Sequence, residues 1–144
     1  MMFINGKTQK FLTIIVALTL MLSALHPGIA FAQSGDGLKR QNNAQSGRVS
    51  FIGPEKGSVV PASQALGIFT RPQDPARALA NRYAPEFGLK DPGRDLSQLK
   101  AKHSKDGRLT VRYQQNYNGI PVMGGELIVN TNENGDLYSM NGEV

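Results

Sequence analysis

The last part of the chain, from Leu109 to Val144, constrains the fold most strongly, because it predicts three β-strands separated by tight turns. Asn118-Gly119 and Asn134-Gly135 favour the left-handed backbone of two-residue hairpin turns. Alternate side chains of the first strand share one face: Leu109, Val111, Tyr113, Gln115 and Tyr117. Gly124-Gly125 weakens strand packing and predicts a bulge or the close approach of another backbone. This end of the chain is therefore expected to form an antiparallel meander.

An amphipathic helix is predicted to begin at Asp74-Pro75. The Asp74 carboxylate can accept from free amides of the first turn, and proline has a φ suited to the first helical position. Apolar residues then recur every three or four positions and predict one buried stripe: Ala76, Leu79, Ala80, Tyr83 and Phe87. Pro85 disfavours continued regular helix, and Gly88 is placed to close the last turn. We interpret the stripe as core rather than as a ligand site.

The whole pattern predicts an α+β fold, with one amphipathic helix packed on an antiparallel β-meander of about four strands. Arg48 to Ile52 predicts a short strand that Gly53-Pro54 stops. Leu96 to His103 predicts a short helical turn followed by a strand. Lys105-Asp106-Gly107 predicts the hairpin connection to the strand that follows. The chain has no cysteine, so its stability must come from packing without disulfides.

Residues 1–32 are typical of a secretory signal peptide. Lys7 and Lys10 precede an apolar run from Phe11 to Leu25, and a small-residue triplet ends at Ala32. Cleavage is predicted between Ala32 and Gln33, and the product is expected to be secreted and extracellular, with no stable membrane anchor. The alternative is an uncleaved amino-terminal anchor, although about 15 apolar residues are short for a span that needs roughly 20.

The mature chain is predicted to have two parts. Residues 33–47 are rich in serine, glycine, asparagine and glutamine, with Leu38 as their one large apolar residue, and they predict a flexible leader. Residues 48–144 are predicted to form one domain. That domain is expected to be truncated at its C-terminal end, because the chain stops two residues past the turn at Asn141-Gly142.

The charge of the chain does not favour nucleic acid as a partner. The formal net charge is +5, and loss of Lys7 and Lys10 with the signal peptide leaves 5 − 2 = +3. Its distribution is uneven: residues 33–108 hold 13 basic and 7 acidic residues, whereas residues 109–144 hold Arg112 against Glu126, Glu133, Asp136 and Glu143. Such asymmetry can steer a partner. A solvated face without a partner is the simpler explanation.

No set of residues in the sequence is able to catalyse bond cleavage. The mature chain keeps one histidine, His103, and no cysteine, so it cannot supply three protein ligands to a catalytic zinc ion. It has neither a His-Glu-x-x-His segment nor a Gly-x-Ser-x-Gly elbow. Asp91, Asp95 and Asp106 lie in predicted turns, where backbone hydrogen bonds account for them, and calcium binding is the alternative. By itself the chain is not expected to be an enzyme.

One group of residues in the strand-rich end resembles the signature of the fungalysin/thermolysin propeptide domain, the N-terminal pro-region of secreted thermolysin-like zinc metalloproteases. We call these the motif residues: Arg112, Gln114, Gln115, Tyr117, Gly119, Pro121, Val122, Gly124, Gly125 and Glu126. The resemblance extends upstream to Phe87-Gly88-Leu89, which is similar to the end of a helix in these pro-regions. Asn130 stands where the family often has a histidine, so any role of that histidine is absent or replaced.

The resemblance implies a pro-region that inhibits its attached metalloendopeptidase in cis and helps it to fold. The implied partners are the cognate catalytic domain and a second pro-region domain, and zinc and calcium are expected only in that catalytic domain. Arg112, Gln114 and Glu126 are the candidate protease contacts, because the turns do not require polar side chains there. The other motif residues can serve folding alone. A stand-alone secreted interaction module is the alternative function.

Overall fold

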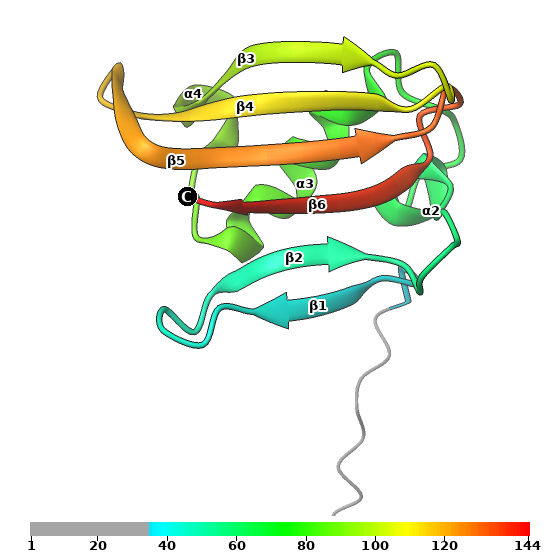
Figure 1. The fold of residues 1–144 in the computed structure, drawn as a ribbon, viewed down its shortest axis with the longest axis horizontal. Helices are drawn as coiled ribbons and strands as arrows, with labels where there is room; N and C mark the ends of the chain where they lie inside the picture. The colour runs from blue at the N-terminus through cyan, green and yellow to red at the C-terminus, as the bar shows by residue number, and fades with distance from the viewer. Residues whose placement is uncertain (1–34) are drawn as a thin grey trace, which may run out of the picture. The chain divides into compact units, whose positions relative to one another are not determined.

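The computed structural model describes residues 35–144 (Figure 1). The predicted signal peptide and its cleavage site at Ala32 and Gln33 lie outside the described residues. Along the chain the elements are β1 (Lys39–Asn42), β2 (Val49–Gly53), α2 (Ala62–Leu66), α3 (Pro75–Phe87), α4 (Pro92–Asp95), β3 (Leu96–His103), β4 (Leu109–Tyr117), β5 (Ile120–Thr131) and β6 (Leu137–Glu143). Among these residues no helix is long and apolar enough to cross a membrane.

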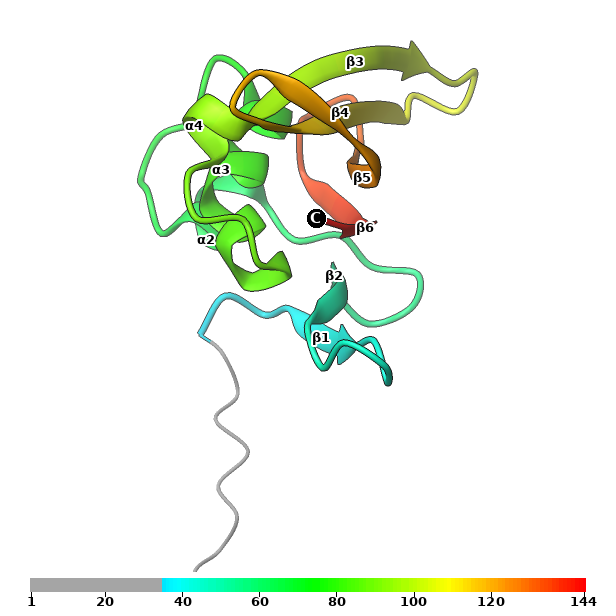
Figure 2. The same ribbon diagram turned by 90° about the vertical axis from the view of Figure 1, so that its left-hand side faces the viewer.

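The strands form one antiparallel sheet in the order β1-β2-β6-β5-β4-β3. The predicted α+β class is confirmed, but within residues 35–144 the sheet has six strands rather than about four, and three helices accompany it where one was expected. The helices gather on one face of the sheet and leave the other face open (Figures 1 and 2). The turn between β3 and β4 projects to the side away from the helices (Figure 2).

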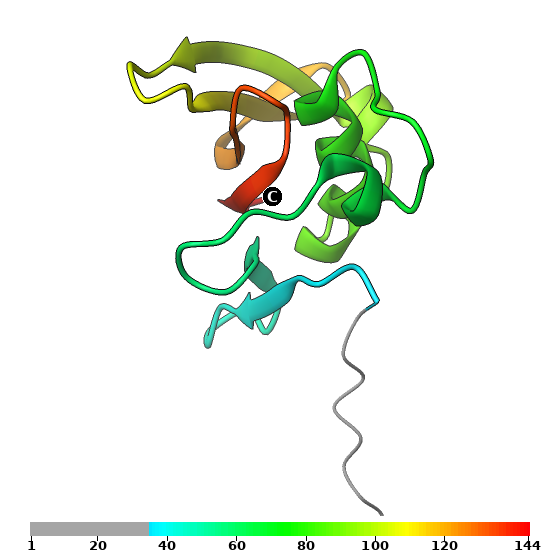
Figure 3. The same ribbon diagram turned by 90° about the vertical axis from the view of Figure 1, so that its right-hand side faces the viewer.

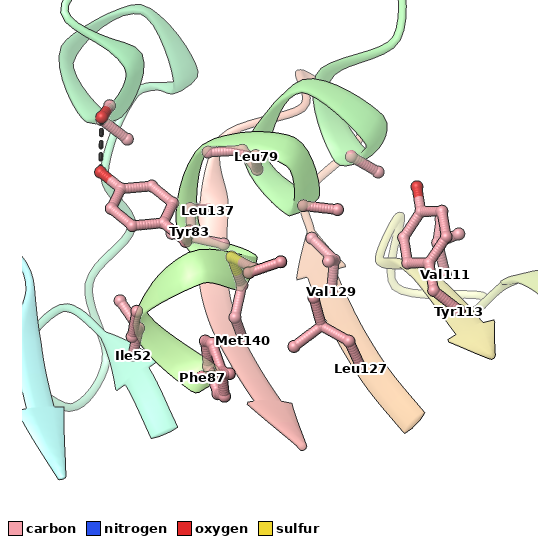
Figure 4. Packing of buried hydrophobic residues seen from close by; sticks show 14 of the residues in the cluster. Ile52, Leu79, Tyr83, Phe87, Val111, Tyr113, Leu127, Val129, Leu137 and Met140 are labelled. Atoms are coloured by element: carbon pink, nitrogen blue, oxygen red, sulfur yellow. Dashed lines mark hydrogen bonds between the residues drawn. The ribbon is translucent and has the colours of Figure 1, made fainter. Parts of the chain in front are cut away.

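The core lies between α3 and the inward face of the sheet (Figure 4). The predicted stripe on α3 is confirmed, because each of its members is at most 2% exposed: Ala76, Leu79, Ala80, Tyr83 and Phe87. Strand residues that meet them include Ile52, Val111, Leu127, Val129, Leu137 and Met140. The Asp74 side chain accepts from the Arg77 amide at 2.9 Å, and Gly88 ends the helix at φ +112°. Pro85 is accommodated inside the last turn of α3.

The structure corrects the expectation of a flexible leader over residues 33–47. Within that range β1 pairs with β2, and Leu38 is buried in the core. Polar contacts join this segment to α3: Arg40 lies 2.8 Å from Glu86, and the Asp36 carboxylate lies 2.7 Å from Arg40 and 3.2 Å from the Tyr83 hydroxyl. The hydrogen bond from Arg40 lowers the pKa of Asp36. The sequence did not predict this strand, because its residues are mostly polar. Partners that are distant in the sequence hold it in place.

The segment around β3 also differs from the prediction. The short helical turn precedes the strand as α4, and all of Leu96–His103 is strand. Leu96 is buried, whereas Leu99 and Ala101 are both exposed. Between β2 and α2 the chain runs past β6, and Val60 forms an isolated bridge with Leu137 (Figure 3).

Candidate functional site

The β4–β5 hairpin carries all of the motif residues, and its turn has the predicted geometry. Asn118 and Gly119 have φ values of +49° and +81°. Two consecutive residues with positive φ are the mark of a type I′ turn, which follows the right-handed twist of the strands. Tyr117 and Ile120 are register partners on either side of it. The motif therefore builds a tight hairpin that ends in a short turn.

Beyond the turn, β5 makes a large bulge beside Gln114. Gln114 is opposite Glu126 and Asn116 is opposite Pro121, so an advance of five residues along β5 corresponds to an advance of two residues along β4. The Gln114 side-chain amide Nε2 lies 2.8 Å from the Val122 carbonyl, 2.9 Å from that of Gly125 and 3.0 Å from that of Gln115. The Gln114 amide thus joins β4 to two carbonyl groups of the bulged part of β5.

The paired glycines allow the bulge to form. Gly124 has φ +75°, a conformation that side chains disfavour. A Cβ at Gly125 would lie 2.6 Å from the Gln115 side-chain oxygen and 3.1 Å from Val122. The sequence predicted a bulge or the close approach of another backbone at this position, and the register shift between Gln114 and Asn116 confirms the bulge. The Gln115 side chain packs directly against Gly125.

Two of the three candidate contact residues pair with each other. Arg112 Nη1 lies 3.2 Å from Glu126 Oε2 on the open face of the sheet, and both side chains remain partly exposed. The third candidate, Gln114, has its amide engaged in the bulge. The structure thus brings Arg112, Gln114 and Glu126 together and gives each of them an intramolecular role.

The hairpin exposes large apolar side chains that the core does not use. Tyr117 and Ile120 are each 69% exposed, and Met123 is fully exposed at 100%. Tyr117 is a motif residue, whereas Ile120 and Met123 were missed by the sequence reasoning. The sequence could have indicated them, since both are apolar residues in the short segment between the predicted turn and the predicted bulge. We call Tyr117, Ile120 and Met123 the hairpin ridge.

A groove of about 300 Å³ adjoins the ridge. Met123, Val122 and the two motif glycines form one wall, and the start of β2 with Val144 forms another. Arg48 and Glu143 supply charged groups at its margin. The Arg48 guanidinium donates to the Val144 carbonyl at 3.1 Å, while Asn43 donates to the Glu143 carboxylate at 2.6 Å. The groove thus continues the surface of the hairpin ridge toward the other end of the sheet.

The acidic residues near the end of the chain have different polar partners. Glu126 pairs with Arg112, Glu143 accepts from Asn43, and Asp136 accepts from Asn132 at 3.1 Å. Of these three carboxylates only Glu126 is paired with a cation within the described residues, because asparagine amides are neutral. Positive charge instead gathers on the β3–β4 hairpin, where Lys100, Lys102, Lys105, Arg108 and Arg112 accompany a single acid, Asp106.

The remaining polar candidates lie in and beside α4, at the end of β3 and in the turn between β3 and β4. His103 is exposed at the end of β3, and the described residues contain no group of three or more metal-ligating side chains. Asp91 accepts from the Arg94 amide, and Asp106 accepts from the Arg108 amide, as expected of turn residues. Asn130 accepts from Thr110 at 2.8 Å and donates to Ser139 at 3.0 Å, so it links three strands across the open face.

Tyr113, the other tyrosine near the motif residues, belongs to the core. Tyr113 is fully buried beneath the hairpin, and the Arg77 guanidinium lies 5.5 Å from its ring centre. Burial raises the pKa of the Tyr113 hydroxyl to about 12. That hydroxyl has no hydrogen-bond partner among residues 35–144. Tyr113 therefore serves the core.

Comparison with known proteins identifies the same segment of the chain. The family model Fungalysin/Thermolysin Propeptide Motif matches residues 95–144, which span α4 from its last residue through β6 and include every motif residue. No curated protein and no solved structure gives a significant match. The resemblance predicted from the sequence is confirmed over this segment: residues 95–144 carry the fungalysin/thermolysin propeptide motif.

Proposed function

We propose that this chain is the pro-region of a secreted thermolysin-like metalloendopeptidase precursor, and that its hairpin ridge contacts the protease domain. The observation that carries the proposal is the coincidence of two properties in one hairpin. The residues matched to the propeptide motif hold the β4–β5 hairpin in place, and the same hairpin presents the exposed side chains of Tyr117, Ile120 and Met123. Clustered exposed apolar side chains are typical of protein interaction sites.

The hairpin is suited to a docking role because its backbone is held rigidly. Its turn, the glycine bulge and the Gln114 amide fix the positions of the strands before any partner arrives. Preorganisation reduces the entropy lost on binding. Methionine adds a flexible, polarisable side chain that adapts to an irregular apolar surface, and Met123 is the most exposed member of the ridge.

In this proposal the chain acts as a cis inhibitor and folding aid of a catalytic domain, together with a second pro-region domain. Zinc and calcium belong to that catalytic domain. Signal cleavage between Ala32 and Gln33 delivers the precursor outside the cell. Arg112 and Glu126 face the open side of the sheet and are secondary contacts, since each must exchange part of its mutual ion pair for a partner.

The test is inhibition in trans of the thermolysin-like metalloprotease of the source organism by the added chain. The wild-type chain should slow peptide hydrolysis. Tyr117→Ala and Met123→Ala should each weaken inhibition by about tenfold, the effect of losing a moderate interface contact of about 1.4 kcal/mol. Phe69→Ala is the matched control, because Phe69 is apolar and at least as exposed as Tyr117 and Met123 but lies outside the hairpin.

Thermal unfolding of the same variants separates contact from folding. All three substitutions remove exposed side chains, so each should change the free energy of unfolding by less than about 0.5 kcal/mol. Arg112→Ala should behave likewise and weaken inhibition to a smaller extent than Tyr117→Ala. A saturating wild-type chain that leaves hydrolysis unchanged would refute the inhibitory role and favour the stand-alone interaction module.

A further inference from the structure

A second surface lies on the open face of the sheet, about the β3–β4 hairpin. A groove of about 470 Å³ is lined there by Leu99, Lys100, Lys102, Thr110 and Arg112, and we call it the basic groove. Its residues belong to the strand at the end of the sheet and to its neighbour. The helices pack against the opposite face (Figure 2). No residue of the hairpin ridge lines the groove, so the two surfaces are separate.

The charges in the groove are unfavourable for the isolated chain. Lys100 and Arg112 are register partners in the β3–β4 pair, which places two like charges directly opposite each other on one face. Such cross-strand pairs are destabilising. Arg112 is partly compensated by Glu126, but neither Lys100 nor Lys102 has an ion-pair partner among the described residues. A binding partner that supplies carboxylates would remove this repulsion.

The groove also has an apolar component. A register shift between Gln98 and Lys100 leaves Leu99 outside the regular ladder, and its side chain is 57% exposed beside the two lysines. An apolar contact next to paired cations suits a segment that carries one apolar and two acidic side chains. The groove contains no aromatic residue on which a nucleobase could stack. Single-stranded nucleic acid, which uses such stacking platforms, is therefore the weaker fit.

The spacing of the cations specifies the shape of the partner. Lys100 and Lys102 are alternate residues of one strand, so they point to the same face about 7 Å apart. Glutamates at alternate positions of an extended segment have the same spacing. We propose that the basic groove binds an extended acidic segment of the protease domain, with two alternate carboxylates on Lys100 and Lys102 and an apolar side chain on Leu99. This inference rests on the proposed function for the identity of the partner.

The recognition chemistry can be tested without the protease, by NMR titration of the isotope-labelled full-length chain at low salt. The probe is the peptide Gly-Leu-Ser-Glu-Ser-Glu-Gly, which places its leucine and both glutamates on one side when extended. It should shift the backbone amides of Leu99, Lys102 and Arg112. The peptide Gly-Leu-Ser-Ser-Glu-Glu-Gly has the same composition with its glutamates on opposite sides, and it should bind severalfold more weakly. A lysine peptide, Gly-Leu-Ser-Lys-Ser-Lys-Gly, should not bind.

Charge reversal supplies the matched controls. Lys100→Glu combined with Lys102→Glu should raise the dissociation constant for the alternating peptide by at least about tenfold, since two attractions become repulsions. Arg82→Glu combined with Lys90→Glu makes the same change in net charge at exposed positions outside the groove. That control should bind the peptide within about twofold of wild type, because salt screens distant exposed charges.

Several results would overturn the inference. These are equal losses in the two double variants, equal binding of the two glutamate peptides, no binding up to the solubility of the probe, or tighter binding of a deoxythymidine oligonucleotide at the same amides. The inhibition assay distinguishes this inference from the proposed function. If the wild-type chain and its Lys100→Glu, Lys102→Glu variant inhibit the protease equally, the basic groove is excluded while the pro-region role stands. If the wild-type chain does not inhibit, the pro-region role itself fails.

Discussion

Replacement of Gln114 by alanine tests whether this motif residue supports the fold or contacts a partner. The sequence placed it among the candidate contacts, whereas the structure directs its amide to two carbonyl groups of the β5 bulge and to the Gln115 carbonyl of its own strand. An amide NH₂ group has two hydrogens, so two of these contacts can be full hydrogen bonds at one time. We therefore expect Gln114→Ala to destabilise the chain rather than only to weaken inhibition.

The size of the effect follows from those two hydrogen bonds. Each contributes about 0.5–1.5 kcal/mol net, and a partly buried carbonyl left without a donor adds to the loss. A total of about 2 kcal/mol is expected. For a domain of this size, each kcal/mol lowers the melting temperature by roughly 4 °C, so Gln114→Ala should melt about 8 °C below wild type.

The assay is thermal and urea unfolding followed by circular dichroism. Gln114→Glu is the first control, because a carboxylate keeps the shape of the side chain but cannot donate to the carbonyls; it should destabilise at least as much as alanine. Gln98→Ala is the second, since Gln98 is exposed on the neighbouring strand, and it should change stability by less than about 0.5 kcal/mol. If Gln114→Ala melted within about 2 °C of wild type yet inhibited poorly, the bulge argument would be refuted and Gln114 would be a contact.

Two further predictions concern the core and its polar partners. Tyr113→Phe should leave the free energy of unfolding in urea unchanged or raise it by up to about 1 kcal/mol, because the Tyr113 hydroxyl is buried without a partner among residues 35–144. Tyr83→Phe should lower it by a similar amount, because the Tyr83 hydroxyl donates to the Ala65 carbonyl. A Tyr83→Phe variant more stable than Tyr113→Phe would contradict this. The pKa of Asp36 is held below its ordinary value of 3.8 by Arg40, so its stabilising contribution should be present above pH 3.8 and be lost as pH falls through the lower folded pKa. The free energy of unfolding, measured against pH, should fall less in acid for Asp36→Asn than for wild type. An equal fall in the two would exclude the Asp36 carboxylate as a source of the acid-dependent loss.

Local sequence signals predicted the elements whose geometry is fixed by adjacent residues. The stripe on α3 follows from helical periodicity and the cap at Asp74. The turn at Asn118-Gly119 follows from the tolerance of these residues for positive φ. Both depend on interactions within a few positions of the chain, so no knowledge of the sheet was needed to find them.

Elements that depend on distant partners could not be predicted in the same way. Strand β1 is polar and four residues long, and its place is set by Leu38 in the core and by the contacts of Asp36 and Arg40 with α3. The position of β2 between β1 and β6 likewise joins segments from opposite ends of the domain. Hydrophobic periodicity carries no information about either arrangement.

The same distinction applies within the motif and determines which residues a functional test should change. Gln114, Gly124 and Gly125 form the bulge, and their replacement would alter the hairpin itself. The side chains of Tyr117, Ile120 and Met123 are largely exposed on this scaffold. A loss of inhibition in a bulge variant would therefore not distinguish docking from folding. Substitutions on the ridge change the surface while leaving its support intact, so only they can show whether the propeptide motif serves to present a binding hairpin.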